Sequence, residues 1–266
     1  MPVSTESHKE GVTVVQMSPE ASSNTFSVEN FQPLIYTLGQ LMEDPNCKSI
    51  VLTGTGKFFS VGGNIGDFSD AIERGEIAQM VEGMTNQLHP LLLKIRSSET
   101  VFVCAINGDA AGGGLGLALS ADYRICAKEA KLASAFFRLG LPPDGGTTWL
   151  LPRLVGFQTA KKFFFNSEIW TSSEALENGA VDEVSDADSL LQRALEVASH
   201  WGNWSTNSRR STKQLLDAST STFFETQLQF EQSLMVAASQ TADFSEGVRA
   251  FIEKRKPIFE DREGSA

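Results

Sequence analysis

The first half of the chain alternates between short apolar runs and longer stretches in which apolar residues recur every three or four positions. Short apolar runs predict buried strands, and the longer period predicts amphipathic helices. Strands are expected at 11–17, 48–52, 100–106 and 123–126, and helices at 27–42, 77–95 and 113–120. Ser27 is expected to cap the first helix. Strands that alternate with helices predict an α/β layered fold with crossover connections.

The segment 55–69 is glycine-rich and is expected to be irregular. The pattern changes after about residue 156, where strands mostly stop. One more short strand is expected at 181–184, and Thr171 with Glu174 forms a capping-box pattern at the start of a helix. From 186 to 259 the period is helical, in three or four segments with breaks near Trp204 and 219–221. We therefore expect an α/β core over 1–200 and a helical C-terminal portion over 201–266.

Composition and charge narrow the classes of partner. The 266 residues are 41% hydrophobic, enough for a large core, and the net charge is −11. An acidic chain argues against a nucleic-acid partner, and a small anionic ligand would need a local basic patch. No apolar stretch reaches membrane-spanning length, the N-terminus lacks a signal-peptide pattern, and the C-terminus is not a Ser-Lys-Leu peroxisomal address. A cytoplasmic protein is expected, with a mitochondrion or peroxisome open for a eukaryotic source.

Several motifs are incomplete. The run 53–57 lacks the outer residues of a P-loop, and the glycines at 112–114 do not complete a dinucleotide fingerprint. The three cysteines (Cys47, Cys104, Cys126) have no metal-like spacing and are interpreted as reduced thiols. The three histidines (His8, His89, His200) are scattered and are interpreted as surface or helix residues, so no metal site is expected.

The segment 105–156 carries the candidate chemistry. Its three consecutive glycines let backbone N–H groups approach a ligand oxygen, and Asp144 follows within Pro-Pro-Asp-Gly-Gly. A carboxylate beside such donors can move a proton on a carbon next to a carbonyl, which is enolate chemistry. The alternative is that Asp144 is only a turn former, since Pro-Asp-Gly is a common turn sequence.

Three segments resemble the crotonase superfamily, also called the enoyl-CoA hydratase/isomerase family. They are VLTGTGKFFSVGGNIGDF at 51–68, AINGDAAGGGLGLALSADYRICAKEAKL at 105–132 and EGVRAFIEKRKPIF at 246–259. The resemblance implies the layered ββα superhelix of that family. It also implies that the N–H groups of Gly63 and Gly113 hold the oxygen of a thioester enolate, Gly113 at a helix N-terminus where the dipole favours negative charge.

The resemblance separates two kinds of chemistry. Hydratases of the family use two glutamates, and the corresponding positions here are Gly116 and Phe136, so water addition is not expected. Asp144 instead resembles the single acidic residue of Δ3,Δ2-enoyl-CoA isomerases and of the ring isomerases of phenylacetate degradation. We expect Asp144 to take a proton from C2 of a 3-enoyl thioester and return it at C4.

The resemblance also supplies binding residues. The acyl pocket is expected from Phe68, Phe136, Leu139 and Leu141. No permanently bound cofactor is expected, because coenzyme A enters as part of the substrate. The coenzyme is expected to contact Lys57, Gly62, Asn64, Ile65, Phe251 and Lys254. Family members form trimers or pairs of trimers, so a homotrimer or hexamer is expected, built through the C-terminal helices.

Other activities are also compatible with the sequence. One is a CoA-thioester dehalogenase or hydrolase in which Asp144 is the nucleophile. Against it, the histidine that activates such a dehalogenase falls near Leu93 and its tryptophan near Phe136. The others are an enoyl-CoA hydratase and a non-catalytic acyl-CoA-binding protein.

Overall fold

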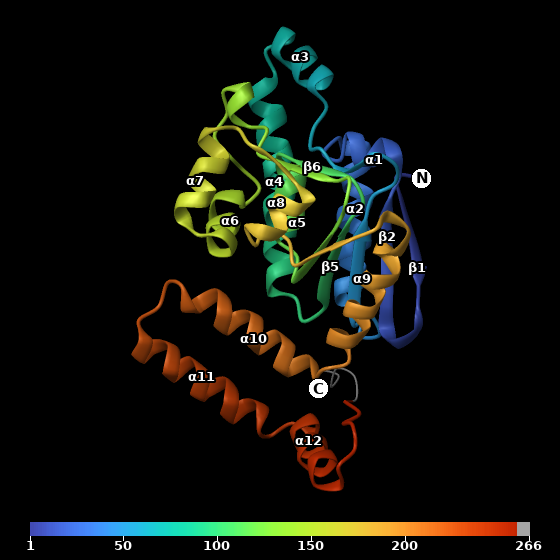
Figure 1. Cartoon of the computed structure of the whole chain (residues 1–266), viewed down its shortest axis with the longest axis vertical. Coiled ribbons are helices and arrows are strands. Elements are labelled where there is room, and N and C mark those ends of the chain that lie inside the picture. The colour runs from blue at the N-terminus through green and yellow to red at the C-terminus, as the bar shows by residue number, and fades with distance from the viewer. Residues whose placement is uncertain (260–266) are drawn as a thin grey trace.

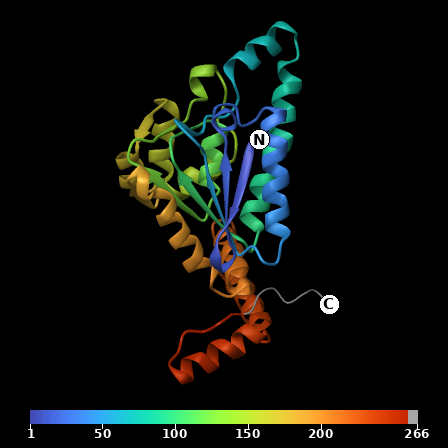
Figure 2. The ribbon, with the colours of Figure 1, turned by 90° about the vertical axis from the view of Figure 1, so that its right-hand side faces the viewer.

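The computed structural model describes residues 1–259 and centres on a six-stranded sheet (Figures 1 and 2). The strand order is β1-β2-β3-β5-β7-β10, with β1 antiparallel to β2 and the other pairs parallel. The strands are β1 (Val3–Ser7), β2 (Val12–Met17), β3 (Ser49–Thr53), β5 (Val101–Ile106), β7 (Tyr123–Ala127) and β10 (Glu183–Ser185). The α/β prediction is confirmed, and so are the strands expected in the first half.

Strand β1 was not predicted because it has no apolar face. It is an edge strand whose residues are mostly exposed, and it is held through its backbone pairing with β2. The last strand, β10, lies slightly later than the expected 181–184. The predicted range begins too early because Val181, which is apolar and buried, lies just before the strand.

A second sheet, of four strands, corrects two expectations. Its order is β4-β6-β8-β9, and its strands are β4 (Phe58–Ser60), β6 (Asp109–Ala111), β8 (Lys131–Ala133) and β9 (Ile169–Thr171). The segment 55–69 is therefore not wholly irregular, since it holds β4 and the start of α3, and strands continue beyond residue 156. Each strand has three residues, which is too short for an alternating pattern to be read.

Helices cover both faces of the large sheet. Figure 2 shows α2 and α4 side by side on one face, while α9 packs against β3 and β5 from the other. Strands β3 and β5 are consequently buried along their whole length, which explains why β5 and the middle of β3 are continuously apolar. The helices of this part are α1 (Pro19–Ser23), α2 (Val28–Glu43), α3 (Ile65–Glu73), α4 (Ile77–Ser97), α5 (Gly113–Leu119), α6 (Thr147–Val155), α7 (Phe157–Phe165), α8 (Ser172–Glu177) and α9 (Ala187–Gly202), with short 3-10 turns η1 (Lys9–Gly11) and η2 (Phe137–Leu139).

The two predicted helix caps are present. The Ser27 hydroxyl accepts a hydrogen bond from the Asn30 amide at 3.3 Å. Thr171 and Glu174 form the reciprocal capping box at the start of α8. These side chains satisfy amide donors that the first turn of a helix cannot use.

The C-terminal helices extend away from the core (Figure 1). They are α10 (Thr206–Ser219), α11 (Phe224–Ala238) and α12 (Ala242–Glu253), so the predicted breaks near Trp204 and 219–221 are confirmed. No residue of α11 is buried, and large apolar side chains such as Phe223, Phe224 and Met235 are exposed. The division at residue 200 stays a prediction, and residues 260–266 of the second part lie outside the described residues.

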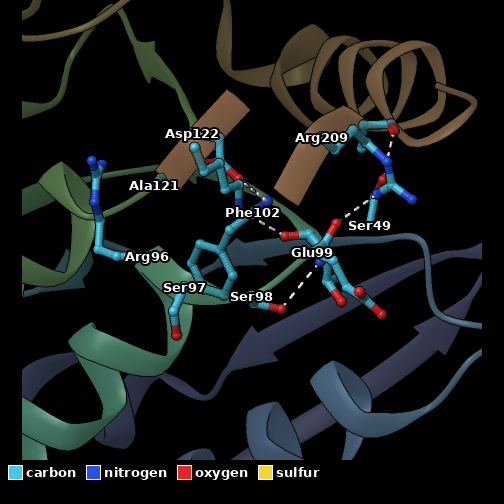
Figure 3. A network of polar contacts seen from close by, with 12 residues as sticks. Ser49, Arg96, Ser97, Ser98, Glu99, Phe102, Ala121, Asp122 and Arg209 are labelled. Atoms are coloured by element: carbon cyan, nitrogen blue, oxygen red, sulfur yellow. Dashed lines mark hydrogen bonds and ion pairs between the residues drawn. The ribbon is translucent and has the colours of Figure 1, made fainter. Parts of the chain in front are cut away.

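Helix α10 is attached to the core by a polar network (Figure 3). Arg209 donates to the backbone oxygens of Lys48 and Glu99, at 3.0 and 2.8 Å. The Lys213 ammonium lies 2.6 Å from an oxygen of Asp122, and that carboxylate also accepts from a backbone amide of β5. Burial lowers the pKa of Lys213, and the charge of Asp122 opposes part of that shift.

Candidate functional site

A cavity of about 840 Å³ lies among α3, α4, the first glycine loop, the start of α5 and the η2 turn. Its wall is mostly apolar, with Phe26, Phe68, Met84 and Leu88 among the side chains that line it. Within residues 1–259 the only carboxylate that lines this cavity belongs to Asp144. A largely apolar cavity with a few polar groups is typical of a site for a small molecule.

The two proposed oxyanion donors meet at this cavity. Gly112 adopts φ 56° and ψ −129°, a backbone conformation that favours glycine, and turns the chain into α5. Gly113 is then the first residue of the helix, where the N–H has no partner within the helix. A Cβ built on Gly62 would lie 3.8 Å from the Gly113 nitrogen, so the two glycine loops are in contact. Neither Gly63 nor Gly113 donates its N–H to a protein acceptor within residues 1–259.

Side chains close around these glycines. A Cβ on Gly63 would lie 2.8 Å from the methyl carbon of Met84, and one on Gly113 would overlap the Phe26 ring. A side chain at Gly113 would thus have to displace the Phe26 ring, whereas one at Gly63 would press on the flexible end of Met84, and both amides have apolar neighbours. An amide in such a place stabilises a negative oxygen more than one in bulk water does.

Gly116 packs directly against the turn that carries Asp144. A Cβ on Gly116 would overlap the backbone oxygen of Gly145, because α5 and the turn that carries Asp144 touch backbone to backbone. A glutamate at this position would displace that turn. The contact that leaves no room for a side chain at position 116 therefore also holds the turn that carries Asp144.

The turn around Asp144 is held by the backbone. The backbone oxygen of Asp144 accepts from the Thr147 hydroxyl at 2.8 Å and from its amide at 3.3 Å, while Gly145 and Gly146 adopt φ of 63° and 70°. The carboxylate takes no part in these contacts. The interpretation of Asp144 as a side-chain turn former is therefore wrong, and its carboxylate is available at the cavity.

His89 is the functional candidate that the sequence interpretation missed. Its Nε2 lies 2.9 Å from Oδ1 of Asp144, with side-chain exposures of 49% and 40%. The two residues are far apart in sequence, and only the folded chain brings α4 beside the turn. In the sequence of α4, His89 stands between Leu88, which is buried, and Pro90. Neither neighbour indicates a functional role, so no local pattern identified it.

This contact bears on the nucleophilic alternative for Asp144. The activating histidine was expected near Leu93, but Leu93 is 71% exposed. The histidine beside the carboxylate is His89, one helical turn earlier. Phe136 does line the cavity, in place of the tryptophan of that dehalogenase.

The other expected site residues divide into two groups. Those that line the cavity are Gly62, Asn64, Ile65, Phe68, Phe136, Leu139 and Leu141. The Lys57 ammonium lies 5.3 Å from the centre of the Phe58 ring, which lines the cavity, although Lys57 itself does not. Phe251 and Lys254 lie at the end of α12, across the molecule from α3 and α4 (Figure 1), so one chain does not bring them to this site.

Other reactive groups lie elsewhere. The three cysteines are free and buried, as expected for reduced thiols, and burial raises the pKa of Cys126 to about 12. Among residues 1–259, no group of histidine, cysteine and acidic side chains could hold a metal ion. The same residues include no helix that is long and apolar enough for a membrane span.

Comparison with known proteins gives consistent results. Residues 7–262 match the model of a family described as enoyl-CoA hydratase/isomerase. The chain is 32% identical over 254 residues to 1,2-epoxyphenylacetyl-CoA isomerase of Escherichia coli (strain K12), covering 95% of this chain and 97% of that protein. It is 34% identical over 254 residues to a probable enoyl-CoA hydratase of Rhodobacter capsulatus, covering 95% and 96%.

A solved structure supports the same assignment. The crystal structure of a putative enoyl-CoA hydratase/isomerase from Mycobacterium abscessus superposes with a TM-score of 0.90 at 30% identity. The match covers 98% of this chain and 100% of the other.

Proposed function

Because the chain belongs to the enoyl-CoA hydratase/isomerase family, the crotonase superfamily, we propose that it is an acyl-CoA isomerase that moves a double bond from the 3- to the 2-position of an enoyl-CoA. The observation that carries this proposal is the single carboxylate, Asp144, at a cavity that also holds two free backbone amides. The printed name of the Escherichia coli relative is also that of a CoA-thioester isomerase.

The mechanism follows from these groups. Asp144 removes a proton from C2 of the 3-enoyl thioester, and the electrons move into a dienolate. The N–H groups of Gly63 and Gly113 hold its oxygen, and each such donor contributes roughly 3–4 kcal/mol to lowering the barrier. Asp144, now protonated, returns the proton at C4 and gives the conjugated 2-enoyl product.

Hydration is disfavoured by the same geometry. Activation of a water in this family uses two glutamates, and their positions hold Gly116 and Phe136. Gly116 touches the backbone of Gly145, so this position leaves no room for a carboxylate. One acid group that serves first as base and then as acid suits a proton shift without added water.

The test replaces the carboxylate with its neutral isostere. Asp144→Asn is expected to lower kcat for a 3-enoyl-CoA by at least about 100-fold, which is the contribution of a general base. The reaction is followed by the absorbance of the conjugated thioester product. Asp70→Asn, an exposed residue of α3, is the matched control and keeps wild-type rates. Unchanged isomerisation in Asp144→Asn, or ready hydration of a 2-enoyl-CoA by the wild type, contradicts the proposal. Binding of acyl-CoA without any turnover points to a non-catalytic protein.

A second candidate rests on the contact between His89 and Asp144. In it, an oxygen of Asp144 attacks an electrophilic carbon of the acyl group and displaces the leaving group, giving an ester to the enzyme. His89 then takes a proton from water, which attacks the ester carbonyl and releases Asp144 as a carboxylate. The 2.9 Å distance between Nε2 and Oδ1 favours this pair as base and nucleophile.

Trapping separates the two candidates. Quenched reactions with a halogenated aromatic acyl-CoA are expected to add the mass of the acyl-CoA less hydrogen halide to the peptide that carries Asp144 only in the nucleophilic mechanism. Turnover in H₂¹⁸O labels Asp144 in that mechanism and leaves it unlabelled in isomerisation. Either label excludes Asp144 as a pure proton carrier.

We further propose that a second copy of the chain completes the coenzyme A site. Lys57 lies beside the cavity, whereas Phe251 is 86% exposed at the distant end of α12. In a homotrimer or hexamer formed through the exposed apolar C-terminal helices, Phe251 and Lys254 of one chain would reach the coenzyme of a neighbour. Sedimentation of the purified protein tests this, and a monomer that turns over at full rate contradicts it.

A further inference from the structure

Arg138 is a charged residue that the proposed mechanism does not use. It lies in the η2 turn (Phe137–Leu139) and lines the same cavity as Asp144. Within residues 1–259 it is the only lysine or arginine that lines this cavity. Its neighbours in the wall, Phe136, Leu139 and Leu141, are apolar.

Arg138 is exposed, and within residues 1–259 its guanidinium makes no hydrogen bond, ion pair or cation-π contact, even though the chain carries a net charge of −11. Other arginines differ, since Arg124 pairs with Asp182 and Arg193 with Glu183. The five N–H donors of its planar fork are thus available to a ligand that enters the cavity, which Arg138 lines.

We propose that Arg138 selects substrates whose acyl group ends in a carboxylate. This inference rests on the proposed function and names its substrate class. If Gly63 and Gly113 hold the thioester oxygen, an acyl chain that passes Asp144 runs along the wall formed by 136–141, where Arg138 lies. A guanidinium binds a carboxylate through two parallel hydrogen bonds, and an apolar wall strengthens that contact.

The phosphates of coenzyme A have the same chemistry, and position distinguishes the two. Two of the residues expected at the coenzyme, Lys57 and Ile65, lie in the segment 55–69, at the turn before β4 and at the start of α3. Arg138 belongs to the segment that carries the expected acyl-pocket residues. The anion near Arg138 is therefore assigned to the acyl group.

The test compares two 3-enoyl thioesters of equal chain length, one ending in a carboxylate and one in a methyl group. The wild type is expected to prefer the carboxylate by about 10- to 100-fold in kcat/KM, the range of a charge-assisted hydrogen bond. Arg138→Met abolishes that preference and Arg138→Lys keeps part of it. Lys161→Met, which removes an exposed cation of α7 outside the cavity, preserves the preference.

Short thioesters that lack the coenzyme phosphates show whether Arg138 binds the acyl carboxylate or a phosphate of coenzyme A. The same preference in the short series supports the assignment. An Arg138→Met variant that raises KM equally for both CoA thioesters, with no effect on the short ones, overturns it and assigns Arg138 to a phosphate. A wild type without preference for the carboxylate also overturns it.

A binding measurement keeps this inference separate from the proposed reaction. Saturated acyl-CoA thioesters with and without a terminal carboxylate do not isomerise, and calorimetry reports their affinities directly. If the wild type fails to isomerise but binds the carboxylated thioester about 10-fold or more tightly, and Arg138→Met loses this difference, the proposed function fails and the role of Arg138 stands. Equal affinities refute that role.

Discussion

The contact between Gly116 and the Gly145 carbonyl can be tested with a pair of glycine-to-alanine substitutions. Gly83 lies inside α4 and Gly116 inside α5, so alanine is the better helix former at both positions. A Cβ at Gly83 meets no atom within 4 Å, whereas one at Gly116 falls well inside the 3.0 Å that real Cβ atoms keep. The two variants share the change in helix propensity and differ in the overlap.

The expected magnitudes follow from that difference. Gly83→Ala gains about 1 kcal/mol of stability from helix propensity. Gly116→Ala gains the same amount but loses about 1–3 kcal/mol, or more, because the overlapping atom is backbone and cannot turn aside. The two melting temperatures should differ by at least about 2–4 °C for each kcal/mol that separates the variants.

Activity should separate the variants more sharply. The overlap pushes the turn that carries Asp144, and a displacement of about 1 Å at a reacting group costs on the order of 100-fold in rate. Thermal unfolding followed by circular dichroism and isomerisation of a 3-enoyl-CoA measure both effects. If Gly116→Ala is as stable and as active as Gly83→Ala, the packing argument for the single-carboxylate site is refuted.

Three further outcomes are expected. His89→Ala removes the hydrogen bond to Asp144 and should lower kcat about 10-fold, while His89→Gln should keep part of the wild-type kcat. Equal steady-state rates in the wild type and both variants would show that the contact is not used. Lys213→Met leaves the Asp122 carboxylate without its cation and should cost about 3–5 kcal/mol in urea unfolding, most of which Lys213→Met/Asp122→Asn recovers; a single variant as stable as the double one would contradict this. Burial raises the pKa of Cys126 from 9.0 to about 12, so its contribution to stability is present below pH 9 and falls as pH rises from 9 towards 12; the fall should be smaller in Cys126→Ala, and equal slopes in both proteins would refute it.

The large sheet could be predicted because burial on both faces leaves a strong local signal. Strand β5 is apolar throughout and β3 is apolar at its three central positions, and the capping residues Ser27 and Thr171 stand where their helices begin. The edge strand β1 and the three-residue strands of the second sheet depend on backbone pairing with distant partners. Their residues carry no period that a sequence can display.

The site was predictable only where its chemistry is local. The glycine cluster and the Pro-Pro-Asp-Gly-Gly turn identified Gly113 and Asp144 from neighbouring residues alone. His89 and Arg138 could not be found in this way, because their importance depends on which surfaces meet. For the same reason the sequence shows a glycine at 116 but not the carbonyl that it accommodates.

The attachment of α10 has a consequence for exchanging parts between related proteins. Arg209 and Lys213 donate largely to main-chain oxygens of the core, those of Lys48, Glu99 and Thr100, which any residue would present. Side chains of the core enter through three ion pairs with the helix, those of Asp122, Arg96 and Glu99. A hybrid that joins this helical arm to the core of a homologue should therefore assemble wherever those three side chains are kept, however much the rest of the contact surface has diverged.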